Sequence, residues 1–279
     1  MADGRRISLL LLMFAMPAAR GETPGAYLGE LSWPVAEQKI AAAPLVIVPF
    51  AAGAKEHGPH LPMNADQAVA EYLLGAAVAS LPVVVVPPVL HGWFPAFRDF
   101  PGTEVADASV FEAYMFEIGM SLVRHGARRL VFLNTGIANA TGLPIAIAAR
   151  EIRAQTGVPT LVVSWGDLET EESALLAEQQ EGGHADEIET SINLYLQPEL
   201  VRMDLAVRDY GERPRQEQTG YAPGSLSRDP DDPAHSASGI YGDATLASAD
   251  KGQRALEIMA GEWLKALQQF SRVPLKKTD

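Results

Sequence analysis

Apolar residues along this chain fall into two kinds of segment, short continuous runs and longer stretches with a helical spacing. The continuous runs occupy residues 45–48, 83–86, 130–133 and 161–163, and each is bounded by proline or polar residues. Such runs are typical of strands that are buried on both faces of a sheet. Because they alternate with helical segments, the pattern predicts a mostly parallel sheet. The expected fold is therefore α/β, a three-layer α/β/α sandwich.

The helical segments carry their own start signals. Ser32 and Ser109 are the expected caps of two helices, and a third helix is expected to begin at Asp66. Residues 167–180 are acidic with a helical spacing, and a further helix is expected over residues 186–196. The last helix has apolar residues at spacings of three and four, which are Leu256, Met259, Trp263, Leu267 and Phe270. Residues 204–243 are polar and irregular, which in a compact domain indicates a functional segment or a subunit contact.

Charge and composition restrict the partners. The chain has 22 basic and 35 acidic residues and a formal net charge of −13. This balance argues against a nucleic-acid-binding surface and against an anionic membrane surface. There is no cysteine, and any metal must therefore be held by nitrogen and oxygen ligands. Such ligands favour zinc, manganese or iron.

The first 21 residues have the order of an export signal. Arg5 and Arg6 precede an apolar run over residues 7–16 that is too short to span a bilayer, and small residues follow at Ala19 and Gly21. We predict a signal peptide over residues 1–21, one domain over residues 22–279, and a periplasmic or secreted location. A buried or membrane-anchored first helix is the alternative.

A polar loop follows the first predicted strand and collects potential ligands. Glu56, His57, His60 and Asp66 lie within eleven residues. Glycine and proline residues between them exclude regular structure, so the side chains sit on a shaped loop. This loop leaves the carboxyl end of a strand, which is where open α/β sheets build their sites.

The segment over residues 56–62, followed by Asp66, resembles the creatininase (creatinine amidohydrolase) family. Four more blocks are similar to those of the family and come in the same order, at residues 31–34, 100–103, 184–191 and 238–243. The resemblance implies an α/β/α sandwich that forms a homo-oligomer, often a hexamer. It also implies one or two divalent metals that activate water to cleave an amide-type, often cyclic, C–N bond. By the same resemblance we expect metal ligands at Glu56, His57, Asp66 and Glu189, a proton-transferring histidine at His184, and substrate contacts at His60 and Trp165.

Two positions depart from the family pattern. The family's first glutamate lies two residues before the histidine, where this chain has Lys55, and Glu56 is displaced by one residue. The loop after the third predicted strand has Gly136 where the family has a histidine ligand. One ligand is therefore missing, and the expectation is one metal site rather than two.

Each of these residues also has a structural interpretation. Asp66 and Glu189 could cap helices, and Lys55 could be a solvated surface charge. Two classes of function follow: an exported metal-dependent amidohydrolase, or a binding or scaffold protein that has lost catalysis on the same fold. A lactone or ester hydrolase would use the same chemistry as the amidohydrolase.

Overall fold

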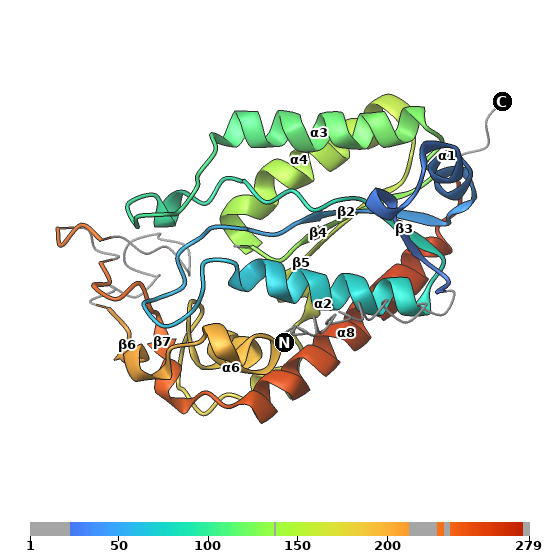
Figure 1. Ribbon diagram of the computed structural model, residues 1–279. Coiled ribbons are helices and arrows are strands. Elements are labelled where there is room, and N and C mark those ends of the chain that lie inside the picture. The colour runs from blue at the N-terminus through green and yellow to red at the C-terminus, as the bar shows by residue number, and fades with distance from the viewer. Residues whose placement is uncertain (1–22, 137, 212–227, 232–234, 276–279) are drawn as a thin grey trace, which may run out of the picture.

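The computed structural model describes residues 23–136, 138–211, 228–231 and 235–275 (Figure 1). The segment predicted to be a signal peptide, residues 1–21, lies outside the described residues, as does much of the irregular stretch over residues 204–243. No helix among the described residues is both long enough and apolar enough to cross a membrane.

A five-stranded parallel sheet forms the centre of the molecule. Its strand order is β1-β3-β2-β4-β5, and every neighbouring pair is parallel. The strands are β1 (Ala26–Tyr27), β2 (Leu45–Phe50), β3 (Val83–Val85), β4 (Leu130–Asn134) and β5 (Thr160–Ser164). The four predicted strands and the predicted α/β fold are confirmed. The sequence pattern missed β1, because two residues are too short for a periodic signal.

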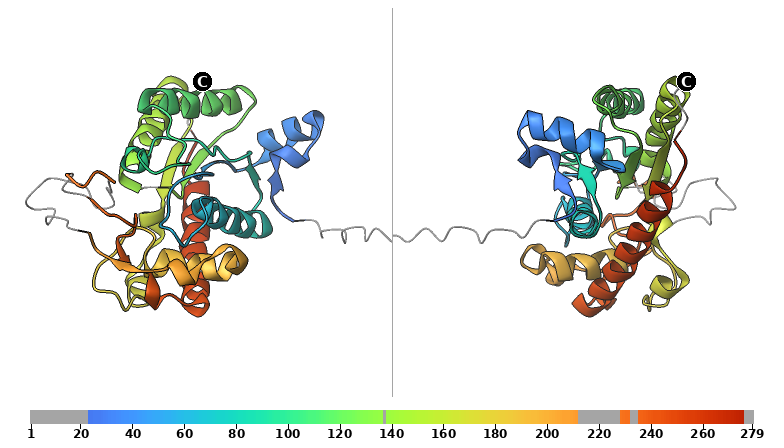
Figure 2. Two further views of the ribbon diagram at one scale, coloured as in Figure 1. Left: turned by 60° about the vertical axis from the view of Figure 1, so that its left-hand side comes forward. Right: turned by 90° about the vertical axis from the view of Figure 1, so that its right-hand side faces the viewer.

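Helices cover both faces of the sheet (Figure 1). They are α1 (Trp33–Ala42), α2 (Ala65–Ser80), α3 (Ala108–Arg124), α4 (Ala138–Thr156), α5 (Glu171–Ala174), α6 (Glu187–Leu196) and α8 (Ala249–Ser271). Helices α3 and α4 pack on one face, and α2, α6 and α8 lie on the other, as the two turned views also show (Figure 2). Alternate residues of β2 explain this, because Val46 and Val48 face the first group whereas Leu45 and Ile47 face the second.

Two helix predictions were wrong in detail. Helix α3 begins after Asp107, two residues before the expected cap at Ser109. Residues 167–180 do not form one helix, since only α5 and a short 3₁₀ turn at Trp165–Leu168 are helical there. Capping boxes at Ser164 and Thr170 each start a separate short turn, and these two starts divide the segment.

Segments distant in sequence meet at the carboxyl ends of β2, β4 and β5. The loop after β2 carries residues 51–64, and the amino-terminal end of α6 approaches it from the far part of the chain. A small antiparallel pair, β6 (Arg208–Asp209) and β7 (Gly242–Asp243), lies beside α6 (Figure 1). A bridge between His184 and Tyr241 joins the residues before α6 to this pair. The fold thus brings the blocks identified in the sequence to one edge of the sheet.

Candidate active site

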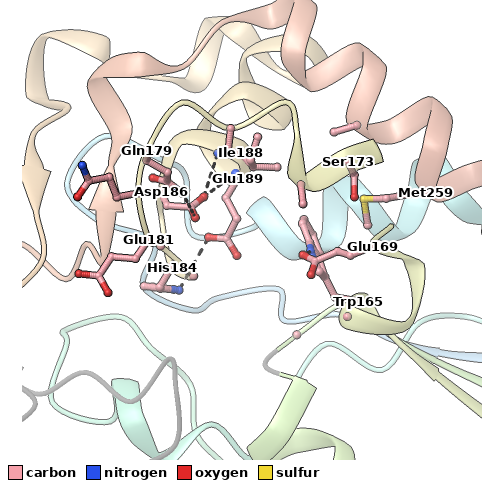
Figure 3. A pocket seen from close by; sticks show the side chains of 18 of the residues that line it. Trp165, Glu169, Ser173, Gln179, Glu181, His184, Asp186, Ile188, Glu189 and Met259 are labelled. Atoms are coloured by element: carbon pink, nitrogen blue, oxygen red, sulfur yellow. Dashed lines mark hydrogen bonds and ion pairs between the residues drawn. The ribbon is translucent and has the colours of Figure 1, made fainter. Parts of the chain in front are cut away.

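A pocket of about 530 Å³ opens at this edge of the sheet (Figure 3). Its lining includes Lys55 and Phe97 from the loops after β2 and β3, Trp165 and Glu169 after β5, and His184 and Glu189 around the start of α6. Polar groups therefore meet at one end of a cavity large enough for a small molecule.

Lys55 is the cation at the buried end of this pocket. Its side chain is only 2% exposed, and Nζ lies 2.8 Å from Asp66 Oδ2. The ammonium also lies 5.3 Å from the centre of the Phe97 ring. The interpretation of Lys55 as a solvated surface charge was wrong, because the loop after β2 turns this side chain inward onto a buried carboxylate.

His57 holds the other oxygen of the same carboxylate. Its Nε2 lies 3.0 Å from Asp66 Oδ1, and its Nδ1 donates to the backbone carbonyl of Lys55 over 2.9 Å. Burial alone would raise the pKa of Asp66, but the Lys55 ammonium and then His57 lower it far below its usual range. Asp66 is in the first turn of α2, whose N-cap residue is Asn64, so it pairs with Lys55 and His57 and does not act as the cap.

His184 lies between two other carboxylates. Its Nε2 donates to Glu56 Oε2 over 3.0 Å, and its Nδ1 is 3.9 Å from Glu189 Oε2. Glu189 in turn accepts a hydrogen bond of 2.6 Å from the backbone N–H of Ala185. Glu56 fixes the position of the imidazole, and Nδ1 is directed toward the pocket and Glu189 (Figure 3).

The two carboxyl groups beside His184 have opposite shifts. Burial opposes ionisation of Glu56, but His184 and the backbone N–H of Gly58 outweigh it and lower its pKa. Burial raises the pKa of Glu189 to about 7, despite the opposing effects of His184 and Lys55. A carboxyl group that titrates near neutrality beside a histidine is suited to proton transfer.

Packing and backbone conformation fix the His184 ring. Phe97 stacks on it with a centroid distance of 4.3 Å, and the His57 ring lies on it at 5.3 Å. Ala185 has φ +49°, the left-handed region that non-glycine residues seldom adopt, and Asp186 then caps α6. The backbone therefore turns sharply directly after the histidine.

A glycine gives Glu56 its space. Gly239 has φ +77°, and a Cβ atom built on it would overlap the Glu56 carboxylate. Within the block over residues 238–243, Gly239 thus contributes because it has no side chain, which lets the backbone approach the Glu56 carboxylate.

The predicted metal ligands do not form a metal-binding group in this arrangement. Across the described residues, no three His, Asp or Glu side chains are placed to hold an ion. Nε2 of His57 is engaged with Asp66, Glu56 is directed to His184 and not to Asp66, and the Lys55 ammonium lies on the carboxylate that an ion would need. The residues present do not fit a divalent metal, because a positive charge already occupies the donor set.

The two predicted substrate-binding residues have different environments. Trp165 lines the pocket, and its Nε1 donates to Glu169 Oε1 over 2.8 Å. His60 is buried with Nε2 2.7 Å from Thr190 Oγ1, and it is not part of the lining described above. A substrate contact by either residue remains a prediction.

Lys55 and Phe97 are the site residues that sequence reasoning missed. The signal for Lys55 was present, because a lysine stood where the resembled family has an acidic ligand. Phe97 had no comparable signal, since an aromatic residue in a loop is most often part of the core.

Comparison with known proteins places the chain in a family. The chain matches the creatininase family, described as creatinine amidohydrolase, over residues 29–267. It is 28% identical to the creatinine amidohydrolase of Pseudomonas putida over 249 residues, which cover 83% of this chain and 92% of that protein. It is 28% identical to the mycofactocin precursor peptide peptidase of Mycolicibacterium smegmatis over 240 residues (82% and 86%), and 23% identical to the 3-dehydro-scyllo-inosose hydrolase of Thermotoga maritima over 261 residues (84% and 80%).

Solved structures of creatininase have the same fold. One crystal structure superposes with a TM-score of 0.73 at 26% identity, covering 90% of this chain and 99% of that one. A manganese form gives a TM-score of 0.71 at 26% identity, covering 88% and 98%. A mutant creatininase described as the Zn-Zn type gives 0.71 at 27%, with the same coverage. Relatives therefore bind manganese or zinc, whereas this chain places Lys55 against Asp66.

Proposed function

The chain belongs to the creatininase family of hydrolases, and from this premise we propose that it hydrolyses an amide-type C–N bond of a small molecule. One observation carries the proposal. His184 is held by Glu56 at the buried end of the pocket, with Nδ1 facing Glu189 and the cavity. This geometry is that of an oriented general base facing a cavity that can hold a substrate.

The proposed reaction uses His184 twice. With Nε2–H donated to Glu56, Nδ1 takes a proton from water as the water oxygen attacks the substrate carbonyl carbon. The carbonyl electrons move to its oxygen, and the tetrahedral intermediate then collapses. As the C–N bond breaks, His184 returns the proton to the leaving nitrogen, and the products are a carboxylic acid and an amine. Glu56 holds the imidazole in position and stabilises its charged form.

The proton-donating groups favour an amide over a lactone. A leaving amine needs a proton, whereas a leaving alkoxide has a weaker requirement for one. The site offers two groups for this step, the imidazolium of His184 and Glu189, whose pKa is raised to about 7 by burial. Two relatives, an amidohydrolase and a peptidase by name, support the same choice.

A panel of cyclic amides, linear amides and lactones tests the proposal. We expect turnover of at least one amide, and a fall in kcat of about 10²–10⁴-fold in His184→Asn, the usual contribution of a general base. His91→Asn is the matched control, because His91 is exposed and outside the pocket lining. Full activity in His184→Asn, or a clear preference for lactones, would reject the amide reaction.

A binding protein without turnover is the second candidate. It is favoured by the lysine on Asp66 and by Gly136, which lines the pocket without offering a ligand atom. In this case a compound from the panel would bind stoichiometrically in calorimetry and remain intact in solution.

We also propose that the chain is exported and self-associates. The order of its first 21 residues supports export, so the intact mass of protein from its native host should correspond to a start near residue 22. The resemblance supports a homo-oligomer, with a hexamer as the expected size. Light scattering on the purified protein measures it, and a monomeric mass would reject the assembly.

A further inference from the structure

Without a built-in cation, the carboxylates around this pocket would give it a net negative charge. Glu189 lines the pocket, and Asp66 and Glu56 lie behind it, bonded to the lining residues Lys55 and His184. Isolated carboxylates in such a site are costly, because each loses its hydration. A cation at this point therefore offsets part of the cost of burying them.

The side chain that provides this cation is Lys55. It is among the largest fully buried side chains of the described residues, and its Nζ is in ion-pair contact with Asp66. The aromatic face of Phe97 lies on another side of the ammonium at 5.3 Å. An ammonium has three N–H donors, and Lys55 lines the pocket. A donor is thus available to a ligand oxygen at the place where the polar groups meet.

We propose that the Lys55 ammonium is the resident cation of this site, standing where relatives hold manganese or zinc, and that it binds the substrate carbonyl oxygen. In the proposed reaction it would stabilise the negative charge that develops on this oxygen when water adds to the carbonyl. The ion pair with Asp66 holds the ammonium in place against the face of Phe97. Lys55 is then a catalytic residue, and Asp66 is a positioning residue.

The geometry also explains why a metal and Lys55 exclude each other. A divalent ion coordinated by Asp66 at about 2.0–2.2 Å would lie close to an ammonium that is itself 2.8 Å from the same carboxylate. Like charges at that separation repel strongly in a buried site. Loss of the lysine charge should therefore increase the affinity of the site for a metal.

Metal content and thermal shift test this without any substrate. The full-length protein is incubated with zinc or manganese chloride, desalted and analysed for bound metal, and its Tm is recorded with and without EDTA. For the wild type we expect substoichiometric metal and an unchanged Tm. Lys55→Gln should bind zinc at least about tenfold more tightly, with a rise in Tm that the added substitution Asp66→Asn removes. Lys265→Gln, which removes an exposed lysine paired with Glu262 on α8, should behave as the wild type does.

Two results would overturn the inference. One equivalent of zinc or manganese bound by the wild type and lost in Asp66→Asn would show that Lys55 does not take the metal's place. Equal zinc affinity in the wild type and Lys55→Gln would show the same. The catalytic role of Lys55 rests on the proposed function, but the metal measurement does not. If no amide is cleaved and the metal results hold, the proposed reaction and the catalytic role of Lys55 fail, but Lys55 remains the resident cation of the site.

Discussion

The ion pair between Lys55 and Asp66 can be measured with a double-mutant cycle. Lys55→Met removes the charge and keeps an unbranched side chain of similar length, and Asp66→Asn removes the charge and keeps the shape. The cycle compares the free energies of unfolding of the wild type, both single variants and the double variant.

The expected magnitude follows from the burial and separation of the two groups. The side chains are 2% and 3% exposed, and 2.8 Å separates Nζ from Oδ2. At an effective dielectric constant of about 20, Coulomb's law gives roughly 6 kcal/mol of gross attraction. Dehydration of both groups offsets much of this, whereas removing one partner leaves a buried unpaired charge at a cost of about 3–5 kcal/mol. The loss of unfolding free energy in the double variant should therefore be smaller than the sum of the two single losses, by at least about 2 kcal/mol.

Urea denaturation followed by circular dichroism at neutral pH gives these free energies. The matched control is the pair Arg202 and Asp204, which has the same 2.8 Å separation with both side chains 62% exposed. Water screens that pair, so its cycle should show no coupling beyond experimental error. Single losses at Lys55 and Asp66 that add within about 0.5 kcal/mol would refute the reasoning, because independent sites behave in that way.

Three further predictions concern other parts of the structure. Gly239→Ala should lower the free energy of unfolding by about 1–3 kcal/mol and impair any activity that depends on Glu56, because it places an alanine in the left-handed region and its Cβ would overlap the Glu56 carboxylate. Gly126→Ala is the control, since at φ +95° its Cβ would make only ordinary van der Waals contact with Ala41, and it should show only the backbone cost. His60 is buried, which lowers its pKa from 6.5 to about 4, so the folded state resists protonation of this residue. The free energy of unfolding should therefore decrease as the pH falls from about 6.5 to about 4, and this pH dependence should weaken in His60→Gln. Trp263→Phe should lower the free energy of unfolding by about 1–3 kcal/mol in urea denaturation, because the fully buried indole N–H donates to the Leu73 carbonyl and the indole ring fills more of the core than a phenyl ring would. A loss below about 0.5 kcal/mol would contradict that packing.

Much of the fold was determined by local pattern. The runs at residues 45–48 and 130–133 contain only apolar residues next to proline, arginine or asparagine, so a buried strand was the simplest interpretation and proved right. Helix α8 carried its apolar residues on one stripe, and those residues are the buried ones. Such periodic signals persist because burial of one face is what makes each element stable. The prediction for residues 167–180 failed because Leu168 and Leu176 are buried from separate short turns, which the capping boxes at Ser164 and Thr170 start, and not from one continuous helix.

The sequence also indicated the residue types of the site, but it did not indicate which of these residues pair with one another. The sequence indicated Glu56, His57, Asp66, His184 and Glu189 as functional groups, and it did not indicate that Glu56 would hold His184 and leave Asp66 to Lys55. Both Lys55 and Glu56 are buried, but they point in different directions, so a shift of one residue in this loop changes which partner each side chain meets. The direction is settled by contacts with α6, the loop carrying Phe97 and the backbone at Gly239, all distant in sequence. Local pattern records which residues avoid water, whereas the pairing of buried charges depends on three-dimensional proximity, and only the tertiary structure decides that.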